Sequence, residues 1–82
     1  MRPGDIYACT KGTYIGSNLV FMESHDDECG FLNLPDMVNM KISTADVKSG
    51  LDSGVLELLE SLPDDIIHIC EKQYEKNSNS RQ

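Results

Sequence analysis

The sequence predicts an α+β protein in which a small SH3-like antiparallel β-barrel of four to five strands is followed by two C-terminal helices. Two observations carry this expectation. Short apolar or alternating runs, separated by glycine, proline and polar clusters, fill residues 5–43 and are typical of strands joined by tight turns. Beyond residue 43, helix start signals and apolar residues at helical spacing replace that pattern. A curved sheet with a helical hairpin on one face is the alternative.

The first strand is expected over residues 5–10, after the turn signal Pro3-Gly4. Its residues alternate, so Ile6 and Ala8 share one face while Tyr7 and Cys9 share the other. Three more strands are expected over residues 13–24, 29–34 and 38–43.

The run 19–22 is apolar on both faces, which indicates burial on both sides, as in a small barrel. Gly16-Ser17 before it suggests a bulge or a tight bend. The polar segment 24–28 is typical of a hairpin tip, and Pro35-Asp36 of a turn.

The second half predicts helices. The segment 43–46 resembles a capping box that opens a single turn, with a loop between Gly50 and Gly54. A short helix capped by Ser53 and ending near Leu62 follows. Ser61, Pro63 and the carboxylates of Asp64 and Asp65 then indicate the start of a last helix. Residues 1–76 are expected to form a single α+β domain, and residues 77–82 a disordered tail.

Charge excludes several classes of function. The 82 residues carry 14 acidic and seven basic side chains, a net charge of −7, with no Lys or Arg at 12–40 or at 49–71. Such a chain is repelled by nucleic acid and by anionic membranes, so direct binding to either is not expected. No apolar run approaches a membrane span, and no signal peptide is recognisable. The odd count of three cysteines indicates reduced thiols, and a cytoplasmic location is expected.

The potential metal ligands and glycines of the sequence do not have the spacing of known metal-binding or phosphate-binding motifs. The densest ligand cluster, residues 25–29, matches neither zinc nor calcium motifs, so no metal and no cofactor is expected. His68 and Cys70 lie two apart on a predicted helix and point in different directions. The glycines form no phosphate-binding loop.

The cysteines Cys9, Cys29 and Cys70 fall within predicted strands or a helix, where a free cysteine is usually a small buried hydrophobe. Asp64 and Asp65 match a role at a helix N-terminus better than a role as an acid–base pair. His68, one turn later, is spaced for a surface pair with them. No catalytic residue is assigned, and the protein is not expected to be an enzyme.

The opening Arg2-Pro3-Gly4-Asp5-Ile6-Tyr7 resembles the first strand of the MazF/PemK toxin family. The resemblance covers six residues and implies an SH3-like barrel and RNA cleavage. Members of that family need a basic RNA groove after the first strands, whereas this chain has no base between Lys11 and Lys41. No functional residue is carried over from the family, and only the barrel gains support.

The sequence therefore predicts a small acidic protein that acts by binding another protein. One version is an inhibitor of a host or partner protein, of the kind that phages and mobile elements encode, whose carboxylates occupy a basic nucleic-acid-binding groove. The expected acidic face comprises Asp26, Asp27, Glu28, Asp36, Glu57, Glu60, Asp64 and Asp65.

Two other modes of action remain open at this point. Met37, Val38 and Met40 fit core packing better than an apolar binding surface, although methionine is common at adaptable interfaces. A homodimer through a strand edge or the last helix would enlarge a small core. The alternative function is a small-molecule or nucleotide binder that uses a barrel pocket, with polar groups from Tyr7, Tyr14 and His68.

Overall fold

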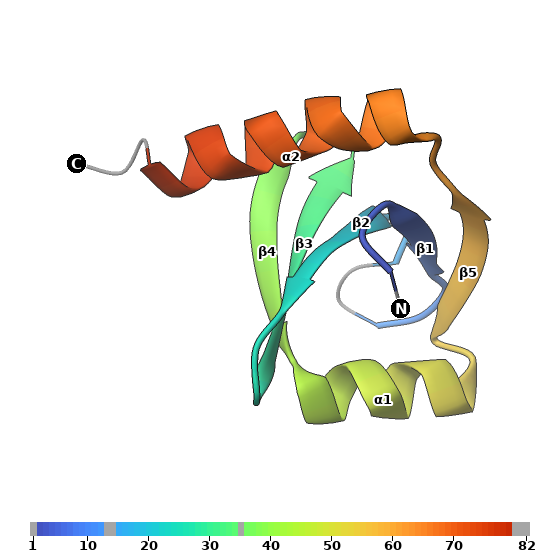
Figure 1. The fold of residues 1–82 in the computed structure, drawn as a ribbon. Helices are drawn as coiled ribbons and strands as arrows, with labels where there is room; N and C mark the ends of the chain where they lie inside the picture. The colour runs from blue at the N-terminus through green and yellow to red at the C-terminus, as the bar shows by residue number, and fades with distance from the viewer. Residues whose placement is uncertain (1, 13–14, 35, 80–82) are drawn as a thin grey trace.

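The computed structural model describes residues 2–12, 15–34 and 36–79, which form five strands and two helices (Figure 1). In chain order these are β1 (Asp5–Cys9), β2 (Asn18–Ser24), β3 (Glu28–Leu34), β4 (Val38–Ser43), α1 (Thr44–Ser53), β5 (Leu56–Ser61) and α2 (Asp64–Asn79). The predicted α+β class is confirmed.

The strands form one antiparallel sheet in the order β4-β3-β2-β1-β5. Strands β4 and β5 are therefore its two edges. No pairing joins these two edges among the described residues, so the sheet is open and the predicted closed barrel is not confirmed. The predicted order of elements is also wrong at one point, because the fifth strand lies between the helices instead of before them.

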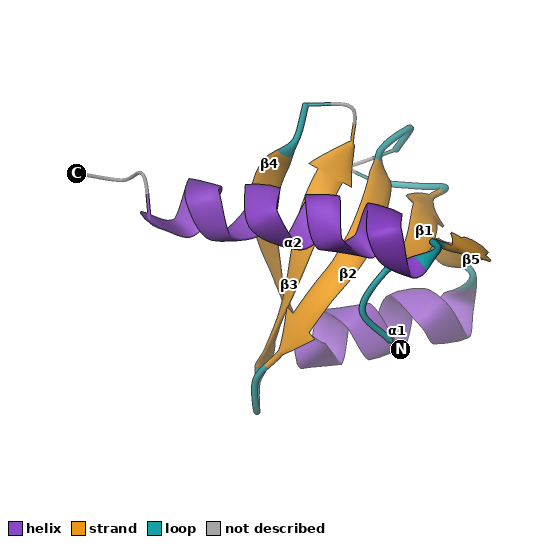
Figure 2. Cartoon of the chain, turned by 45° about the horizontal axis from the view of Figure 1, so that its top comes forward, coloured by secondary structure: helices purple, strands orange, loops and turns teal. Residues whose placement is uncertain are grey.

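The helices lie on opposite faces of the sheet, which excludes the alternative of a helical hairpin on one face (Figure 1, Figure 2). Residues Tyr7 and Cys9 pack on the α1 side and Ile6 packs on the α2 side, as the alternation in β1 predicts. Strand β2 is buried on both faces because a helix covers each face. The fully buried side chains at the centre are Leu19, Val20, Phe31 and Leu32.

Helix α1 starts as predicted and runs longer than predicted. The Ser43 hydroxyl accepts a hydrogen bond from the Asp46 N–H at 3.1 Å, which satisfies one free donor of the first turn. The helix then continues to Ser53 and ends at Gly54, whose φ of 83° is the left-handed conformation that glycine adopts readily. Gly50 lies inside this helix, not in a loop as predicted. The helix packs closely on β5 there, since a Cβ at Gly50 would lie 3.1 Å from the Leu56 side chain.

Strand β5 replaces the helix that the sequence predicts over residues 53–62. Leucines at 56, 58 and 59 fit a helical stripe and a short strand equally well, so their spacing does not decide between the two. Pairing with β1 stabilises the strand conformation, since residues 5–9 pair with β5 although they lie about fifty positions earlier in the chain. Ser53, expected to cap that helix, is the last residue of α1.

Helix α2 begins near the predicted position. The Pro63 carbonyl accepts hydrogen bonds from the N–H groups of Ile66 and Ile67. Ser61, expected to cap this helix, lies at the end of β5 and donates its hydroxyl to Asp5 instead. The helix continues to Asn79, so residues 77–79 of the expected tail are helical, whereas residues 80–82 lie outside the described part.

The C-terminal half of α2 is joined to β4 and the preceding turn by side-chain amides. The Asn39 amide nitrogen donates to the Tyr74 carbonyl at 2.9 Å and to the Ser78 hydroxyl at 3.0 Å. The Asn77 amide nitrogen donates to the Met37 carbonyl at 2.8 Å and to the Asn39 side-chain oxygen at 2.9 Å. This network fixes the helix across the sheet.

The three cysteines are buried and unpaired, with Cys9 and Cys29 on the α1 side of the sheet and Cys70 on the α2 side. Met37 and Met40 pack against the cores, as predicted, while Val38 is half exposed. Neither described helix combines the length and the apolar character that crossing a bilayer requires.

Candidate functional site

The eight carboxylates of the predicted acidic face fall into three separate places. Asp26 and Asp27 lie at the β2–β3 hairpin tip, and Glu28 is the first residue of β3. Asp36 lies in the turn between β3 and β4, at the opposite end of β3. A strand of seven residues is about 20 Å long, so these two groups do not form one contact surface.

The other four carboxylates surround the junction of β5 and α2. Glu57 and Glu60 lie on β5, opposite Ala8 and Ile6 of β1, and Asp64 and Asp65 occupy the first turn of α2. All four are exposed. The structure therefore places half of the predicted set on two consecutive elements, β5 and the first turn of α2.

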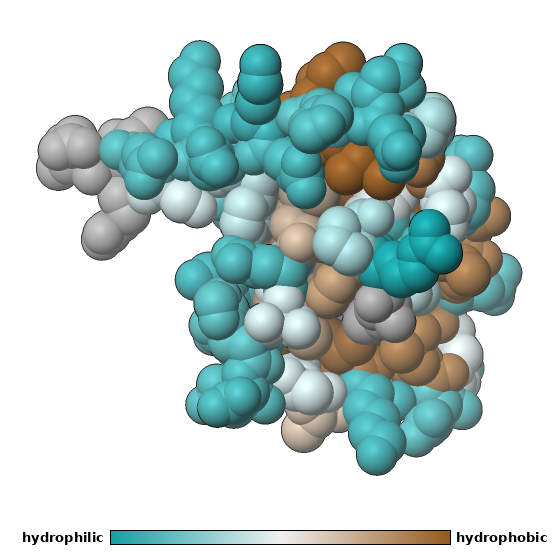
Figure 3. Space-filling view, in the orientation of Figure 1, coloured by the Kyte–Doolittle hydropathy of each residue, from teal (hydrophilic) through white to brown (hydrophobic). Residues whose placement is uncertain are grey.

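Exposed leucines lie between these carboxylates. Leu58 is 54% exposed and Leu59 is 52% exposed, and Figure 3 shows apolar surface over β5 at the right of the view. The pairing with β1 shifts between Ile6 and Tyr7, so Leu59 has no direct partner and β5 is bulged there. We define the β5–α2 corner as Glu57, Leu58, Leu59, Glu60, Asp64 and Asp65.

The outer edge of β5 is unpaired among the described residues, since β5 is the last strand of the sheet. Such an edge offers a row of backbone donors and acceptors to another strand. Residues 49–71 contain no Lys or Arg, and no ion pair joins a carboxylate of the corner to a base among the described residues. Sequence reasoning found its carboxylates but missed its strand edge.

Asp5 connects β1 to β5 beside this corner. One carboxylate oxygen accepts a hydrogen bond from the Ser61 hydroxyl at 2.6 Å, and the other accepts one from the backbone N–H of Arg2 at 3.1 Å. The bond from Ser61 is the main cause that lowers the pKa of the Asp5 carboxyl, against the opposing effect of burial. Asp5 therefore stabilises the fold in its charged form.

Replacing Asp5 with asparagine is expected to lower the free energy of unfolding at neutral pH. Because the pKa is lowered in the folded state, the contribution of Asp5 is present above its ordinary value of 3.8 and is lost as the pH falls below it. Urea unfolding across the acid range measures the difference between the variant and the wild type. That difference should shrink below pH 3.8. Asp52→Asn, at an exposed position on α1, is the matched control; a constant difference for Asp5→Asn contradicts the assignment.

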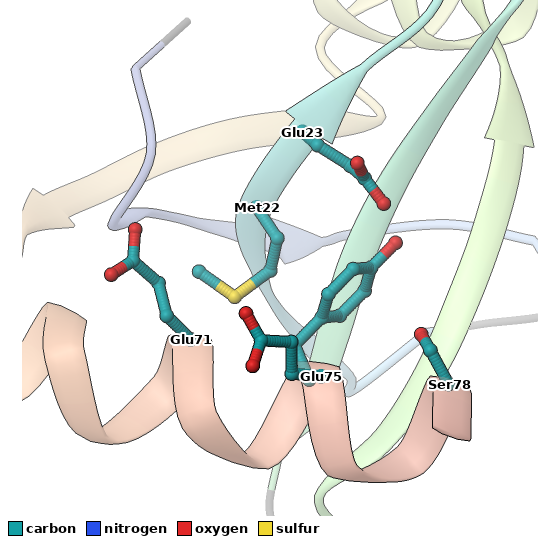
Figure 4. Close-up of a pocket in the computed structure, with 6 residues that line it drawn as sticks. Met22, Glu23, Glu71, Glu75 and Ser78 are labelled. Atoms are coloured by element: carbon teal, nitrogen blue, oxygen red, sulfur yellow. The ribbon is translucent and has the colours of Figure 1, made fainter.

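A second acidic feature lies between β2 and α2. A pocket of about 440 Å³, called here the β2–α2 pocket, is lined by Met22, Glu23, Glu71, Tyr74, Glu75 and Ser78. Figure 4 shows Glu71, Glu75 and Ser78 on the helix facing Met22 and Glu23 on the strand. The residues at 71, 75 and 78 share one helix face because they are spaced by about one turn.

A bulge in β2 brings Glu23 into this pocket. Phe21 pairs with Phe31 and Glu23 pairs with Gly30, which leaves Met22 as the extra residue. Strict alternation would direct Glu23 to the α1 side, opposite to Met22. The bulge instead directs both Met22 and Glu23 toward α2. No signal in the sequence marks this bulge, so Glu23 could not be predicted as a site residue.

The Tyr74 hydroxyl is buried in the wall of the pocket and has no hydrogen-bond partner among the described residues. It lies above Gly30 and beside the Glu23 side chain, in space that a Cβ at Gly30 would fill. Burial, followed by the nearby carboxylates of Glu23 and Glu28, raises the pKa of Tyr74. The hydroxyl is therefore protonated and able to donate at neutral pH.

Two histidines contact the pocket carboxylates from outside. His25 Nε2 lies 3.2 Å from Glu23 Oε1, and His68 Nδ1 lies 3.4 Å from Glu71 Oε1. The expected pairing of His68 with Asp64 or Asp65 is thus replaced by pairing with Glu71. No group of three or more His, Cys, Asp and Glu side chains that could hold a metal ion occurs among the described residues.

The alternative barrel pocket corresponds to a cavity of about 250 Å³ under α1. It is lined mainly by apolar groups, including Cys9, Leu19 and Leu56, and by Lys11 and Asp46. Tyr7 and His68 do not line it, and His68 is exposed on α2 across the sheet. Tyr14 lies outside the described residues. The predicted polar groups are therefore not brought together at this cavity.

No family model, no curated protein and no solved structure matches this chain. The function proposed below is therefore argued from the residues of the two sites and their positions in the fold.

Proposed function

We propose that the protein acts by binding another protein, and that the β5–α2 corner pairs with an extended, basic segment of that partner. The observation that carries the proposal is an unpaired strand edge bearing exposed leucines and flanked by four carboxylates. Addition of a partner strand to such an edge supplies backbone hydrogen bonds, and the side chains supply specificity. Charge complementarity favours Lys or Arg beside apolar residues in the partner strand.

A second copy of this chain fits the edge less well. If two β5 strands pair antiparallel about Leu58 and Leu59, each Glu57 lies opposite the Glu60 of the other copy. Like charges directly opposite each other destabilise a strand pair. With a net charge of −7 on each copy, this edge favours a basic partner over a homodimer.

The proposal extends to inhibition of the partner. A basic surface that accepts these carboxylates is also suited to the phosphates of nucleic acid. A chain bound there excludes nucleic acid from the partner, which is how a small acidic protein acts as an inhibitor.

Reversing the charges of β5 is expected to weaken partner binding by about tenfold or more, because complementary charges set both association rate and specificity. The variant is Glu57→Lys with Glu60→Lys. Its matched control is Asp26→Lys with Asp27→Lys, which makes the same change of net charge at the hairpin tip. Tagged wild type and both variants are compared by capture from a cytosolic extract with quantitative mass spectrometry, at low and at high salt.

The expected result is a partner that the wild type and the hairpin variant retain and the β5 variant loses. Purified partner then gives the affinities by calorimetry, and a competition with nucleic acid tests inhibition. Partners that bind all three chains equally, or that the two variants lose equally, contradict the assignment to the β5–α2 corner.

A further inference from the structure

We propose that the β2–α2 pocket binds the ammonium or guanidinium group of an organic cation, held by the carboxylates of Glu23, Glu71 and Glu75. This site is separate from the β5–α2 corner and does not depend on the function proposed there. Its ligand is defined by charge, by shape and by an unpartnered buried hydroxyl.

The charge of the pocket is negative and only partly compensated. Three carboxylates line it, and no Lys or Arg is among its lining residues. Glu23 and Glu71 are each paired with a histidine, while Glu75 makes no ion pair with a residue that the structure describes. A concave site lined by one sign of charge concentrates ions of the opposite sign.

The Tyr74 hydroxyl supplies an independent indication of a ligand. Tyr74 is only 8% exposed, and its hydroxyl forms no hydrogen bond in the described residues. Buried polar groups are almost always hydrogen-bonded, so an exception requires an explanation. The Glu23 side chain lies beside this hydroxyl, and its Oε1 lies 3.2 Å from His25 Nε2.

A bound cation explains both observations. We expect the Glu23 carboxylate to turn from His25 to the cation and, in that position, to accept a hydrogen bond from the adjacent Tyr74 hydroxyl. Tyr74 is thus a positioning residue for Glu23, and Gly30 leaves the space that its hydroxyl needs. The bulge at Met22 is what directs Glu23 toward this position.

The size and the lining of the pocket favour an organic cation over a metal ion. A volume of about 440 Å³ far exceeds one ion and falls in the range of small-molecule pockets. The described residues offer no cluster able to hold a metal. Met22 provides a flexible apolar wall that suits the methylene chain of a lysine, an arginine or a diamine.

The test titrates the full chain with agmatine, which carries both a guanidinium and an ammonium group, and follows amide chemical shifts by NMR. Saturable shifts are expected at residues 22–23 and 71–78. Glu75→Gln is expected to weaken binding by about tenfold, because the amide still accepts a hydrogen bond but no longer carries the negative charge that pairs with the cation. Glu57→Gln, which removes the same charge from β5, is the matched control and should leave the affinity unchanged.

Tyr74→Phe separates positioning from a purely structural role. It should weaken agmatine binding while leaving the unliganded chain as stable as the wild type or more so, because an unsatisfied polar group is removed. A loss of stability together with unchanged binding assigns the hydroxyl to the fold and overturns its role at the site.

The same cationic group can come from a free diamine or from an arginine of another protein. A blocked Ala-Arg-Ala peptide is therefore titrated beside agmatine; preferential binding of one identifies the source. Shifts that do not saturate, or that spread equally to the hairpin tip and β5, indicate general charge screening and overturn the proposal. Affinities that are equal in the wild type and Glu75→Gln also overturn it.

Discussion

Replacing Phe31 with alanine is expected to lower the free energy of unfolding by about 4 kcal/mol, the largest effect we expect from one substitution. Phe31 lies at the centre of β3 and is fully buried on the α1 side of the sheet. Its ring packs edge to face against Phe21, with centroids 5.6 Å apart and planes at 74°. Alanine removes this contact and leaves a cavity between the sheet and α1.

Urea unfolding followed by circular dichroism measures the loss, since the chain has no tryptophan. Val38→Ala, on the edge strand β4 at a half-exposed position, is the control and should cost less than about 1 kcal/mol. A small domain is stable by only about 5–15 kcal/mol, so Phe31→Ala should leave little margin against unfolding. Similar losses for the two variants would show that Phe31 does not occupy the core.

Gly30→Ala is expected to destabilise the protein by about 2 kcal/mol, the cost of forcing an extra methyl group into a packed site. The added carbon overlaps the Tyr74 hydroxyl and lies 3.1 Å from Cγ of Glu23, so α2 or the Tyr74 side chain must shift. The same shift distorts the β2–α2 pocket.

A double-mutant cycle with Tyr74→Phe tests the cause. Removing the hydroxyl takes away the closest contact and leaves the ring carbon Cζ, at 3.0 Å, so the rescue should be partial. Thermal unfolding of the four chains gives the coupling free energy. Additive effects would mean that Gly30 is required for a reason unrelated to Tyr74. Gly12→Ala is unsuitable as a control, because Gly12 has a positive φ that alanine adopts with strain.

The strands up to residue 43 could be predicted because their signals are local. Alternation in β1 and β4 and the turn residues between the strands act over a few positions, and the start of α2 is marked in the same way. Strand β5 could not be predicted, because its leucines fit two periods and its conformation is set by pairing with β1. The open sheet was missed for a related reason. Burial of β2 on both faces is equally consistent with a barrel and with two covering helices.

The candidate sites were predicted only in part. The sequence reveals that long segments lack a base, but the separation of Asp26 from Asp36 depends on the length and direction of β3. Glu71 and Glu75, one turn apart on a predicted helix, could have been paired from spacing alone. Glu23 could not, because one extra residue in β2 reverses the face it occupies.

The placement of the three cysteines has a consequence for measuring the motions of the chain. Cys9 and Cys29 are covered on the α1 side, whereas Cys70 is covered on the α2 side. Burial, with a smaller effect of Glu71, raises the pKa of the Cys70 thiol. In the folded protein Cys70 therefore forms little thiolate, the species that an alkylating reagent attacks. Each thiol then reacts only when its own layer opens. Alkylation followed by peptide mass spectrometry therefore times the detachment of each helix from the sheet without adding any foreign probe.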